Sequence, residues 1–346
     1  WEATNRRTDK YGGATLAQFN YLGGLGVERI QYPDASGPAF IDEVNAYDAA
    51  GRFIRLTVAH DDGMGQTTLL DDRTFTWDMA GNRSSTTDML PGDTHAHDYS
   101  YDSADRLVHT DFDNGIQNVA IDYTLDGVGN RVLVSGGAGA GAYSADSLHQ
   151  YTDTPFDTRS YDAVGNTKTM TNPDVPMAWN YRNELVRWEN VVSGKVVTYR
   201  YDVFGRPVRR TETGAGSGTI RYRWFGNGLV EENNTTSGTV RSYAHSAGDI
   251  RVLVNEDGVY RLHPDQFGTV FAVTRETGAI VARYDYSDFG SPRDLMTALV
   301  DNDRHFAGFW FDEDLEFYRA GHRFYEPRTG KFVSRDPLGV WGDRFS

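Results

Sequence analysis

The stretch Tyr47-Asp48-Ala49-Ala50-Gly51-Arg52 is the first clear copy of a phrase that recurs along the chain. In this phrase a usually aromatic residue is followed by Asp or Asn, two variable residues, Gly or a substitute, and then most often Arg or Asn. Later copies begin at Trp77, Tyr101, Leu125, Tyr161, Trp179 and Tyr201. Successive copies start 30, 24, 24, 36, 18 and 22 residues apart, so a constant unit is joined by arms of variable length.

The chemistry of the phrase predicts the turn of a β-hairpin. The Asp carboxylate can fold back onto backbone amides, and the Gly position can take the left-handed conformation that such a turn needs. Asp105 and Asn183 replace Gly in two copies, and both residue types tolerate positive φ. We therefore assign structural roles in the repeat to Tyr47, Asp48, Gly51, Trp77, Asp78, Gly81, Tyr101, Asp102, Tyr161, Asp162, Gly165, Tyr201, Asp202 and Gly205.

The stretches between the phrases read as β-strands. Runs such as Phe53–Val58 and Val196–Tyr201 alternate apolar residues with Arg or Thr, which gives one packed face and one polar face. Aromatic residues make up 13% of the chain, and no long helical period is present. Because one hairpin cannot bury its apolar face alone, successive units should pair into a continuous, curled or spiralling sheet. We expect an all-β protein.

Composition argues against several classes of function. The net charge of −15 opposes a nucleic-acid groove, so we expect no nucleic-acid partner. The absence of Cys removes disulfides, thiolate metal sites and Cys nucleophiles. No apolar run of about 18 residues is present, so we expect no membrane span in this chain. Because the sequence begins at Trp1 without a signal pattern, we expect it to be an excerpt of a longer protein.

Candidate metal and ligand sites have simpler interpretations. His95 and His97, beside Asp93 and Asp98, could place two imidazoles on one strand face, but residues 91–94 read as a loop, so we interpret this region as an exposed polar turn. The stretch Asp111–Gly115 lacks the spacing of a calcium loop and is interpreted as a turn. Regular Tyr and Trp residues could stack on sugars, although in a repeat they usually form the core. We expect no metal and no cofactor.

The phrases resemble the YD repeats of RHS proteins, of the C components of bacterial ABC-type toxin complexes and of teneurins. The later stretches His263–Thr269, Tyr284–Gly290, Phe306–Phe309 and Phe317–Gly339 resemble the RHS repeat-associated core segment. This resemblance divides the chain into weakly matched N-terminal shell strands (1–46), a YD-repeat array (47–260) and the core segment (261–346). The residues that carry the core motif are Tyr318, Arg323, Tyr325, Pro327, Gly330, Phe332, Arg335, Pro337 and Gly339. Within the same segment we interpret His322 as a packing or hydrogen-bonding residue.

The resemblance implies a hollow β-shell that encloses a polypeptide, in many members a C-terminal toxin released by self-cleavage. That cleavage resembles aspartyl-protease chemistry, in which two Asp residues from successive Asp-Pro-x-Gly motifs share a proton. Asp336 belongs to the first motif, and the chain ends at Ser346 before a second copy. We therefore expect Asp336 to be half of an autoproteolytic pair and do not expect this chain to cut itself.

Two other classes of function stay open beside the toxin cage. The favoured interpretation is a secreted or cell-surface bacterial protein whose partner is its own C-terminal cargo. The alternative is an adhesion or glycan-binding scaffold without cleaved cargo, whose partners would be surface glycans or proteins. A hydrolase with an unrecognised carboxylate pair is a third candidate, but Asp and Glu number 49 here, so pairs will occur by chance.

Overall fold

The computed structural model describes residues 6–11, 14–22, 26–34, 37–90, 95–172, 174–215, 217–246, 249–294, 296 and 298–336. Within these ranges the regular structure is a succession of antiparallel strands, with one short 3₁₀ turn at Phe306–Gly308. The predicted all-β fold is confirmed. None of the described residues forms a helix with the length and apolar character that a membrane crossing would need. The chain divides into two compact units, which are described separately.

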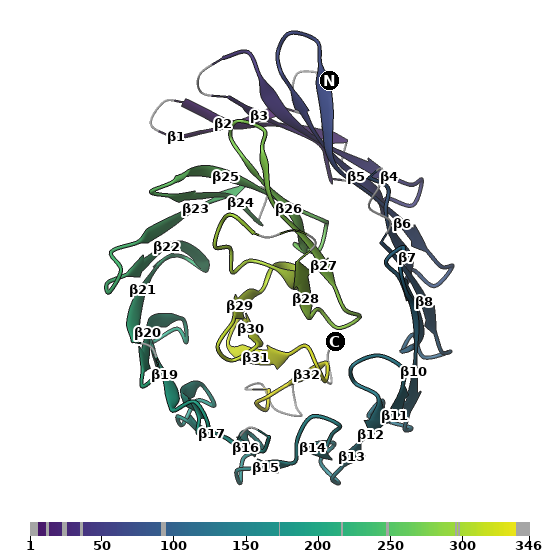
Figure 1. The fold of residues 1–346 in the computed structure, drawn as a ribbon, viewed down its shortest axis with the longest axis vertical. Coiled ribbons are helices and arrows are strands. Elements are labelled where there is room, and N and C mark those ends of the chain that lie inside the picture. The colour runs from purple at the N-terminus through teal and green to yellow at the C-terminus, as the bar shows by residue number, and fades with distance from the viewer. Residues whose placement is uncertain are drawn as a thin grey trace. The chain divides into compact units, whose positions relative to one another are not determined.

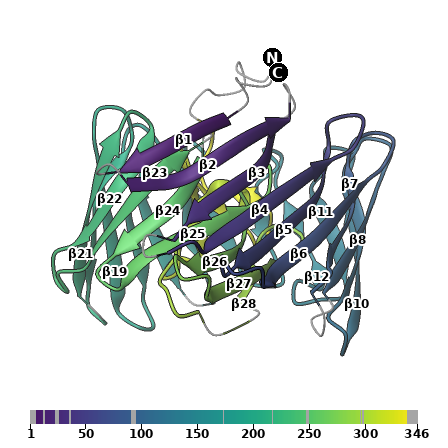
Figure 2. The same cartoon turned by 90° about the horizontal axis from the view of Figure 1, so that it is seen from above.

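The first unit comprises Trp1–Tyr123, Ala244–Tyr286 and Pro292–Asn302. Neighbours in the chain pair antiparallel from β1 to β10 and again from β24 to β28. Strands β1 to β6 lie side by side in Figure 2. The strands are β1 (Arg6–Tyr11), β2 (Ala14–Leu22), β3 (Gly26–Pro33), β4 (Phe40–Tyr47), β5 (Phe53–Asp61), β6 (Thr67–Trp77), β7 (Arg83–Asp88), β8 (Ala96–Tyr101), β9 (Leu107–Asp113), most of β10 (Asn118–Leu125), β24 (Asp249–Asn255), β25 (Gly258–Pro264), β26 (Val270–Arg275), β27 (Ile280–Tyr286) and β28 (Pro292–Asp294).

The core of the first unit lies between these two runs of strands. The ring of Phe75 on β6 lies 6.0 Å from that of Phe271 on β26, and the Tyr32 ring on β3 lies 5.7 Å from that of His263 on β25. Charged side chains also cross this interior, since Arg251 donates to Glu43 at 2.7 Å. Inward-facing residues of β3, β4 and β6 therefore contact residues of β24 to β27. The strands that carry these residues are labelled in Figure 1.

The second unit comprises Thr124–Tyr243, Ser287–Ser291 and Asp303–Ser346. Strands β15 to β23 pair antiparallel in chain order, and β29 to β32 form a separate four-stranded sheet. The strands are β11 (Arg131–Ser135), β12 (Gly141–Ala142), β13 (Ser144–Ala145), β14 (Tyr151–Asp153), β15 (Arg159–Tyr161), β16 (Thr167–Met170), β17 (Val175–Trp179), β18 (Leu185–Asn190), β19 (Lys195–Tyr201), β20 (Pro207–Thr213), β21 (Gly218–Phe225), β22 (Gly228–Asn234), most of β23 (Val240–Ser246), β29 (Trp310–Asp312), β30 (Phe317–Ala320), β31 (Arg323–Glu326) and β32 (Lys331–Phe332).

Every copy of the repeat phrase closes a turn of the same geometry. In the first copy the Gly51 N–H donates to the Asp48 carbonyl at 2.9 Å, and the Asp48 carboxylate accepts the N–H groups of Ala50 and Arg52, both at 2.9 Å. At the degenerate copies Asp105 has φ +57° and Asn183 has φ +58°, which confirms the expected left-handed conformation. The same turn hydrogen bonds occur around Asp78, Asp102, Asp126, Asp162, Asn180 and Asp202.

The aromatic residue of the phrase links each hairpin to the one before it. The Tyr201 hydroxyl donates to the Leu185 carbonyl at 2.7 Å, and the Trp179 indole N–H donates to the Thr167 carbonyl at 2.7 Å. In both cases the acceptor is the residue directly after the preceding phrase. The sequence predicts ring packing on a neighbour but not this hydrogen bond, which is repeated from Tyr47 to Val27, Trp77 to Phe53, Tyr101 to Arg83 and Tyr161 to Tyr151.

Removing this hydrogen bond at one copy should weaken the array measurably. Tyr201→Phe keeps the ring and leaves the Leu185 carbonyl without its donor, so we expect the free energy of unfolding to fall by about 1–3 kcal/mol. Tyr181→Phe is the matched control, because the Tyr181 side chain is 93% exposed. This substitution should lower the free energy of unfolding by no more than about 0.5 kcal/mol. Denaturant unfolding followed by fluorescence compares the two variants, and equal losses would remove the role assigned to the hydrogen bond.

The turn carboxylates should make the fold sensitive to acid. The side chain of Arg106, followed by its backbone N–H, lowers the pKa of Asp102 from 3.8 to about 2, and backbone hydrogen bonds within their own turns also lower the pKa of Asp48 and Asp78. A lowered folded-state pKa stabilises the protein above pH 3.8, and this contribution is lost as the pH falls toward 2. Asp102→Asn should lose less stability than the parent chain between about pH 4 and pH 2, measured as the unfolding midpoint at each pH. Identical pH profiles would contradict this assignment.

Candidate functional site

The C-terminal segment forms the hydrophobic core of the second unit. Phe317 on β30 and Phe324 on β31 are buried, and they belong to one apolar cluster with side chains from four successive strands of the repeat array, β16 to β19. The apolar residues brought together in this way are Met170, Val175, Met177, Leu185, Trp188, Val197, Tyr199, Leu315, Phe317, Phe324 and Val333. The last part of the segment that resembles the RHS core, from Leu315 to Val333, is therefore an integral part of this unit rather than an appended tail.

Several core-motif residues fasten this sheet to the turn at Ser287–Ser291. The Tyr318 hydroxyl donates to the Gly290 carbonyl at 2.7 Å, and the Tyr325 hydroxyl donates to the Phe289 carbonyl at 2.9 Å. Gly330 has φ +69°, and a Cβ there would lie only 2.7 Å from the Phe289 ring. These motif positions hold the four-stranded sheet to that turn.

The remaining core-motif residues lie toward the end of the described chain. The Arg323 guanidinium lies 3.6 Å from the centre of the Phe332 ring. Pro327 is buried in the turn between β31 and β32, and Arg335 lies beside Gly165. The interpretation of His322 as a hydrogen-bonding residue agrees with its Nδ1, which lies 3.3 Å from the Gly205 carbonyl oxygen. Pro337 and Gly339 lie outside the described residues.

Asp336, the predicted catalytic carboxylate, forms an ion pair with Arg323. Its Oδ2 lies 3.0 Å from Nη1 of Arg323, and its side chain is 38% exposed. Because Arg323 begins β31, this ion pair fixes the carboxylate at the end of the four-stranded sheet. Its predicted role needs a second acid close by, so as described Asp336 is a positioned carboxylate and its catalytic role stays a prediction.

A buried ion-pair network joins the repeat array to the core segment. Arg159 on β15 donates to both oxygens of Glu326 on β31 at 2.7 and 2.9 Å, and to both oxygens of Asp157 at 2.5 and 3.0 Å. Burial alone would raise the pKa of Glu326, but the charge and hydrogen bonds of Arg159 hold it below its usual value. The Thr329 hydroxyl also donates to Glu326 at 2.5 Å. No sequence pattern indicates this pair, because its members are 167 residues apart.

The interpretation of His95–His97 as an exposed polar turn is wrong for His97. His97 lies in β8, is 2% exposed, and its Nε2 lies 2.9 Å from Asp285 Oδ1 on β27. The strand begins at Ala96 and turns this ring inward, where it also packs on Phe112 at 4.6 Å between ring centres. A search of the described residues finds no group of three or more side chains able to hold a metal ion.

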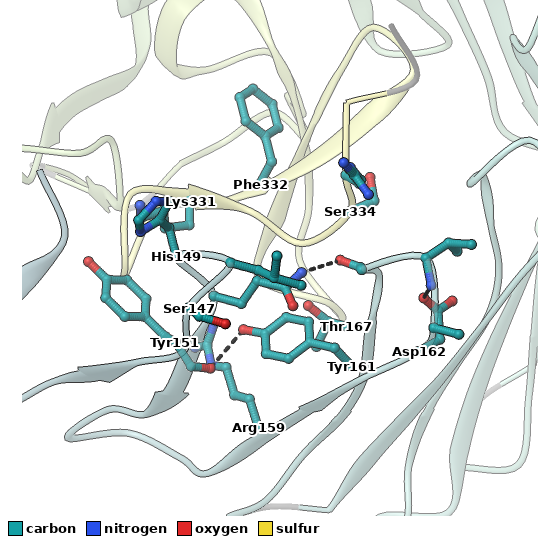
Figure 3. Close-up of a pocket in the computed structure, with 16 residues that line it drawn as sticks. Ser147, His149, Tyr151, Arg159, Tyr161, Asp162, Thr167, Lys331, Phe332 and Ser334 are labelled. Atoms are coloured by element: carbon teal, nitrogen blue, oxygen red, sulfur yellow. Dashed lines mark hydrogen bonds between the residues drawn. The ribbon is translucent and has the colours of Figure 1, made fainter. Parts of the chain in front are cut away.

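Three sheet edges border a cavity of about 430 Å³ in the second unit (Figure 3). Tyr151 comes from β14, the last strand of a two-stranded sheet, and Tyr161 comes from β15, the first strand of the next sheet. Lys331 and Phe332 form β32, the last strand of the four-stranded sheet. Between β14 and β15 the Tyr161 hydroxyl donates to the Tyr151 carbonyl at 2.7 Å, so a side chain spans the gap between the two backbones here.

Comparison with known proteins gives one family and several distant relatives. The Teneurin YD-shell family matches residues 43–343. The tRNA nuclease WapA of Bacillus subtilis is 28% identical over 68% of this chain and 10% of its own length. The double-stranded DNA deaminase toxin A of Burkholderia cenocepacia is 26% identical over 78% of this chain and 21% of its own length. The chain thus spans between a tenth and about a fifth of the length of these curated relatives.

A solved structure also aligns with nearly the whole chain. The Photorhabdus luminescens Tc holotoxin pore matches 96% of this chain and 20% of its own chain, with 16% identity and a TM-score of 0.42. The assignment rests instead on the family match, which spans most of the chain, from just before the first phrase to beyond Asp336. That match confirms the predicted YD-repeat β-shell class, and the chain belongs to the Teneurin YD-shell family.

Proposed function

We propose that this chain is the shell-forming part of a longer bacterial protein, secreted or held at the cell surface, that carries a C-terminal toxin as its cargo. The relatives support this proposal, because the names of two of them describe a tRNA nuclease and a deaminase toxin. The chain matches only a small share of each relative, so the toxic activity itself would reside in residues outside the matched region. The division into shell strands, repeat array and core segment stays a prediction within this proposal.

The observation that carries the proposal is the anchoring of the C-terminal segment. Phe317 and Phe324 are buried in the second unit, and the ion pair of Asp336 with Arg323 fixes the last described part of the chain. Any polypeptide that continues from Asp336 would therefore start from a fixed point on a rigid sheet. This arrangement suits a scaffold that must keep hold of one end of a cargo.

Release of that cargo would use aspartyl chemistry. Asp336 would supply one carboxylate and a second Asp-Pro-x-Gly motif further along the protein would supply the other. Two close carboxylates share one proton, so one can accept a proton from the attacking water while the other donates. Asp336 acts in this scheme only together with that partner.

The proposal is tested by expressing the complete reading frame and following its fragments. We expect two fragments by mass spectrometry, of which the smaller is C-terminal and survives added protease better inside the purified protein than when produced alone. An intact, uncleaved protein whose C-terminal region is digested as fast as the isolated fragment would contradict the cage. That result would favour an adhesion scaffold instead.

A further inference from the structure

We propose that the cavity bordered by β14, β15 and β32 binds an extended peptide that carries a carboxylate side chain. The inference goes beyond cargo carriage and does not depend on cleavage at Asp336. The volume of the cavity, about 430 Å³, lies within the range of about 300–1,000 Å³ that is typical of ligand sites.

The edges around the cavity favour a peptide. β14, β15 and β32 are each the terminal strand of their sheet. Terminal strands present backbone N–H and C=O groups on which an extended segment can add as a further strand. β14 and β15 are joined by an isolated bridge at Asp153 and Thr158, and further along the Gln150 side chain donates to the Gly165 carbonyl at 2.7 Å. Side chains thus replace a regular backbone ladder along the cavity.

The charge inside the cavity favours an acidic peptide. Lys331 donates to the Asn130 side-chain oxygen at 3.1 Å and lies 5.2 Å from the centre of the Tyr151 ring. Within the described residues no carboxylate lies at ion-pair distance from Lys331 or from Arg335, which also lines the cavity. The carboxylate of Asp162 lines the cavity too, but it accepts hydrogen bonds from Asn166 within its own turn. Burial, reinforced by the charge of Arg131 and only partly opposed by that of Asp126, lowers the pKa of Lys331, so its ammonium would gain from a further anionic neighbour. By contrast, the nearby Arg159 is already paired with two carboxylates.

A buried hydroxyl is a second, independent indication of a ligand. Ser334 lines the cavity, is only 5% exposed, and its Oγ has no hydrogen-bond partner among the described residues. Buried polar atoms are nearly always paired in folded proteins. Figure 3 places Ser334 on the same segment as Lys331 and Phe332, so one peptide could contact the hydroxyl and the ammonium together.

The test uses a fluorescently labelled hexapeptide, acetyl-Val-Thr-Glu-Val-Thr-Val-amide, and a second peptide in which Gln replaces Glu. Fluorescence anisotropy is measured with the whole chain at about 0.15 M salt, where the Debye length of about 8 Å screens the general repulsion from its net charge of −15. We expect the Glu peptide to bind at least about tenfold more tightly than the Gln peptide. The preference should disappear as the pH rises through the lowered pKa of Lys331.

Variants assign the preference to the cavity. Lys331→Gln should abolish the difference between the two peptides, whereas Lys168→Gln, which removes an exposed lysine outside the cavity, should preserve it. Ser334→Ala should weaken the binding of both peptides by the same factor. Circular dichroism confirms that each variant is folded. Equal binding of both peptides by the parent chain, an unchanged preference in Lys331→Gln, or displacement of the peptide by an equal concentration of acetate would each overturn the proposal.

Discussion

Arg159→Met should lower the free energy of unfolding of the second unit by about 3–5 kcal/mol, because it leaves buried Asp157 without its cation and leaves Glu326 with only its contact to the partly exposed Arg328. Arg159 is 7% exposed, while its partners Asp157 and Glu326 are 7% and 0% exposed. Methionine fills much of the volume of the lost side chain, so charge rather than a cavity dominates the loss. Denaturant unfolding at neutral pH measures it.

The pH dependence of this loss identifies its electrostatic origin. In the parent chain Arg159 helps to hold the pKa of Glu326 below 4.5, so the contribution is present above that pH and is lost as the pH falls through the folded-state pKa. In the variant, burial is opposed only by Arg328 and by the Thr329 hydroxyl, so the pKa of Glu326 should rise relative to the parent chain. The difference between the two proteins should therefore shrink in acid.

Two companion variants separate burial from charge. Adding Glu326→Gln to Arg159→Met should restore part of the stability, since the amide removes a buried charge that has lost its main cation. Arg223→Met breaks an exposed pair with Glu231 and should cost no more than about 0.5 kcal/mol. A cost for Arg159→Met as small as that for Arg223→Met would show that the network contributes little.

The parts of the fold that could be predicted are those whose cause lies within a few residues. In the phrase that begins at Tyr47, the carboxylate of Asp48 and the left-handed Gly51 act on atoms of the same turn, so the sequence is sufficient. The repeat phrase nevertheless does not identify the turn at Asp146–Gln150, where Ala145 replaces the aromatic residue and His149 takes φ +63° in the Gly position.

The core segment contains further copies of the same turn. At Asp265–Thr269 the Gly268 N–H donates to the Asp265 carbonyl, and at Ser287–Ser291 a Ser hydroxyl takes the place of the Asp carboxylate. The Tyr286 hydroxyl also donates to the carbonyl of Val270, directly after the first of these turns. Two stretches that resemble the RHS core segment, His263–Thr269 and Tyr284–Gly290, therefore include degenerate copies of the repeat phrase.

The interior could not be predicted from the sequence, because its partners lie far apart along the chain. His97 meets Asp285 across 188 residues, and the local context of His97 resembles a loop. The cavity beside β32 depends on three sheet edges that meet only after folding. Periodicity identifies which residues face inward, but it does not identify which inward residues meet.

Asp336→Asn in the complete protein should abolish cleavage, which is the largest effect expected of any single substitution. An amide can neither accept a proton from the attacking water nor share one with a neighbouring carboxyl group. The fold should survive, since Asn preserves the shape of Asp and the lost pair with Arg323 is partly exposed and worth at most about 1 kcal/mol. Gel electrophoresis with intact mass measurement should show one full-length species in place of two fragments.

The matched control is Asp257→Asn, which changes an exposed carboxylate in the turn between β24 and β25 and should leave cleavage unchanged. A protein truncated after Ser346 should stay whole on prolonged incubation, because it would contain Asp336 but no second Asp-Pro-x-Gly motif. Cleavage of full-length Asp336→Asn at the original site would exclude the aspartyl mechanism. Cleavage lost together with the thermal unfolding transition would instead assign Asp336 a structural role, so the two measurements must be made on the same preparation.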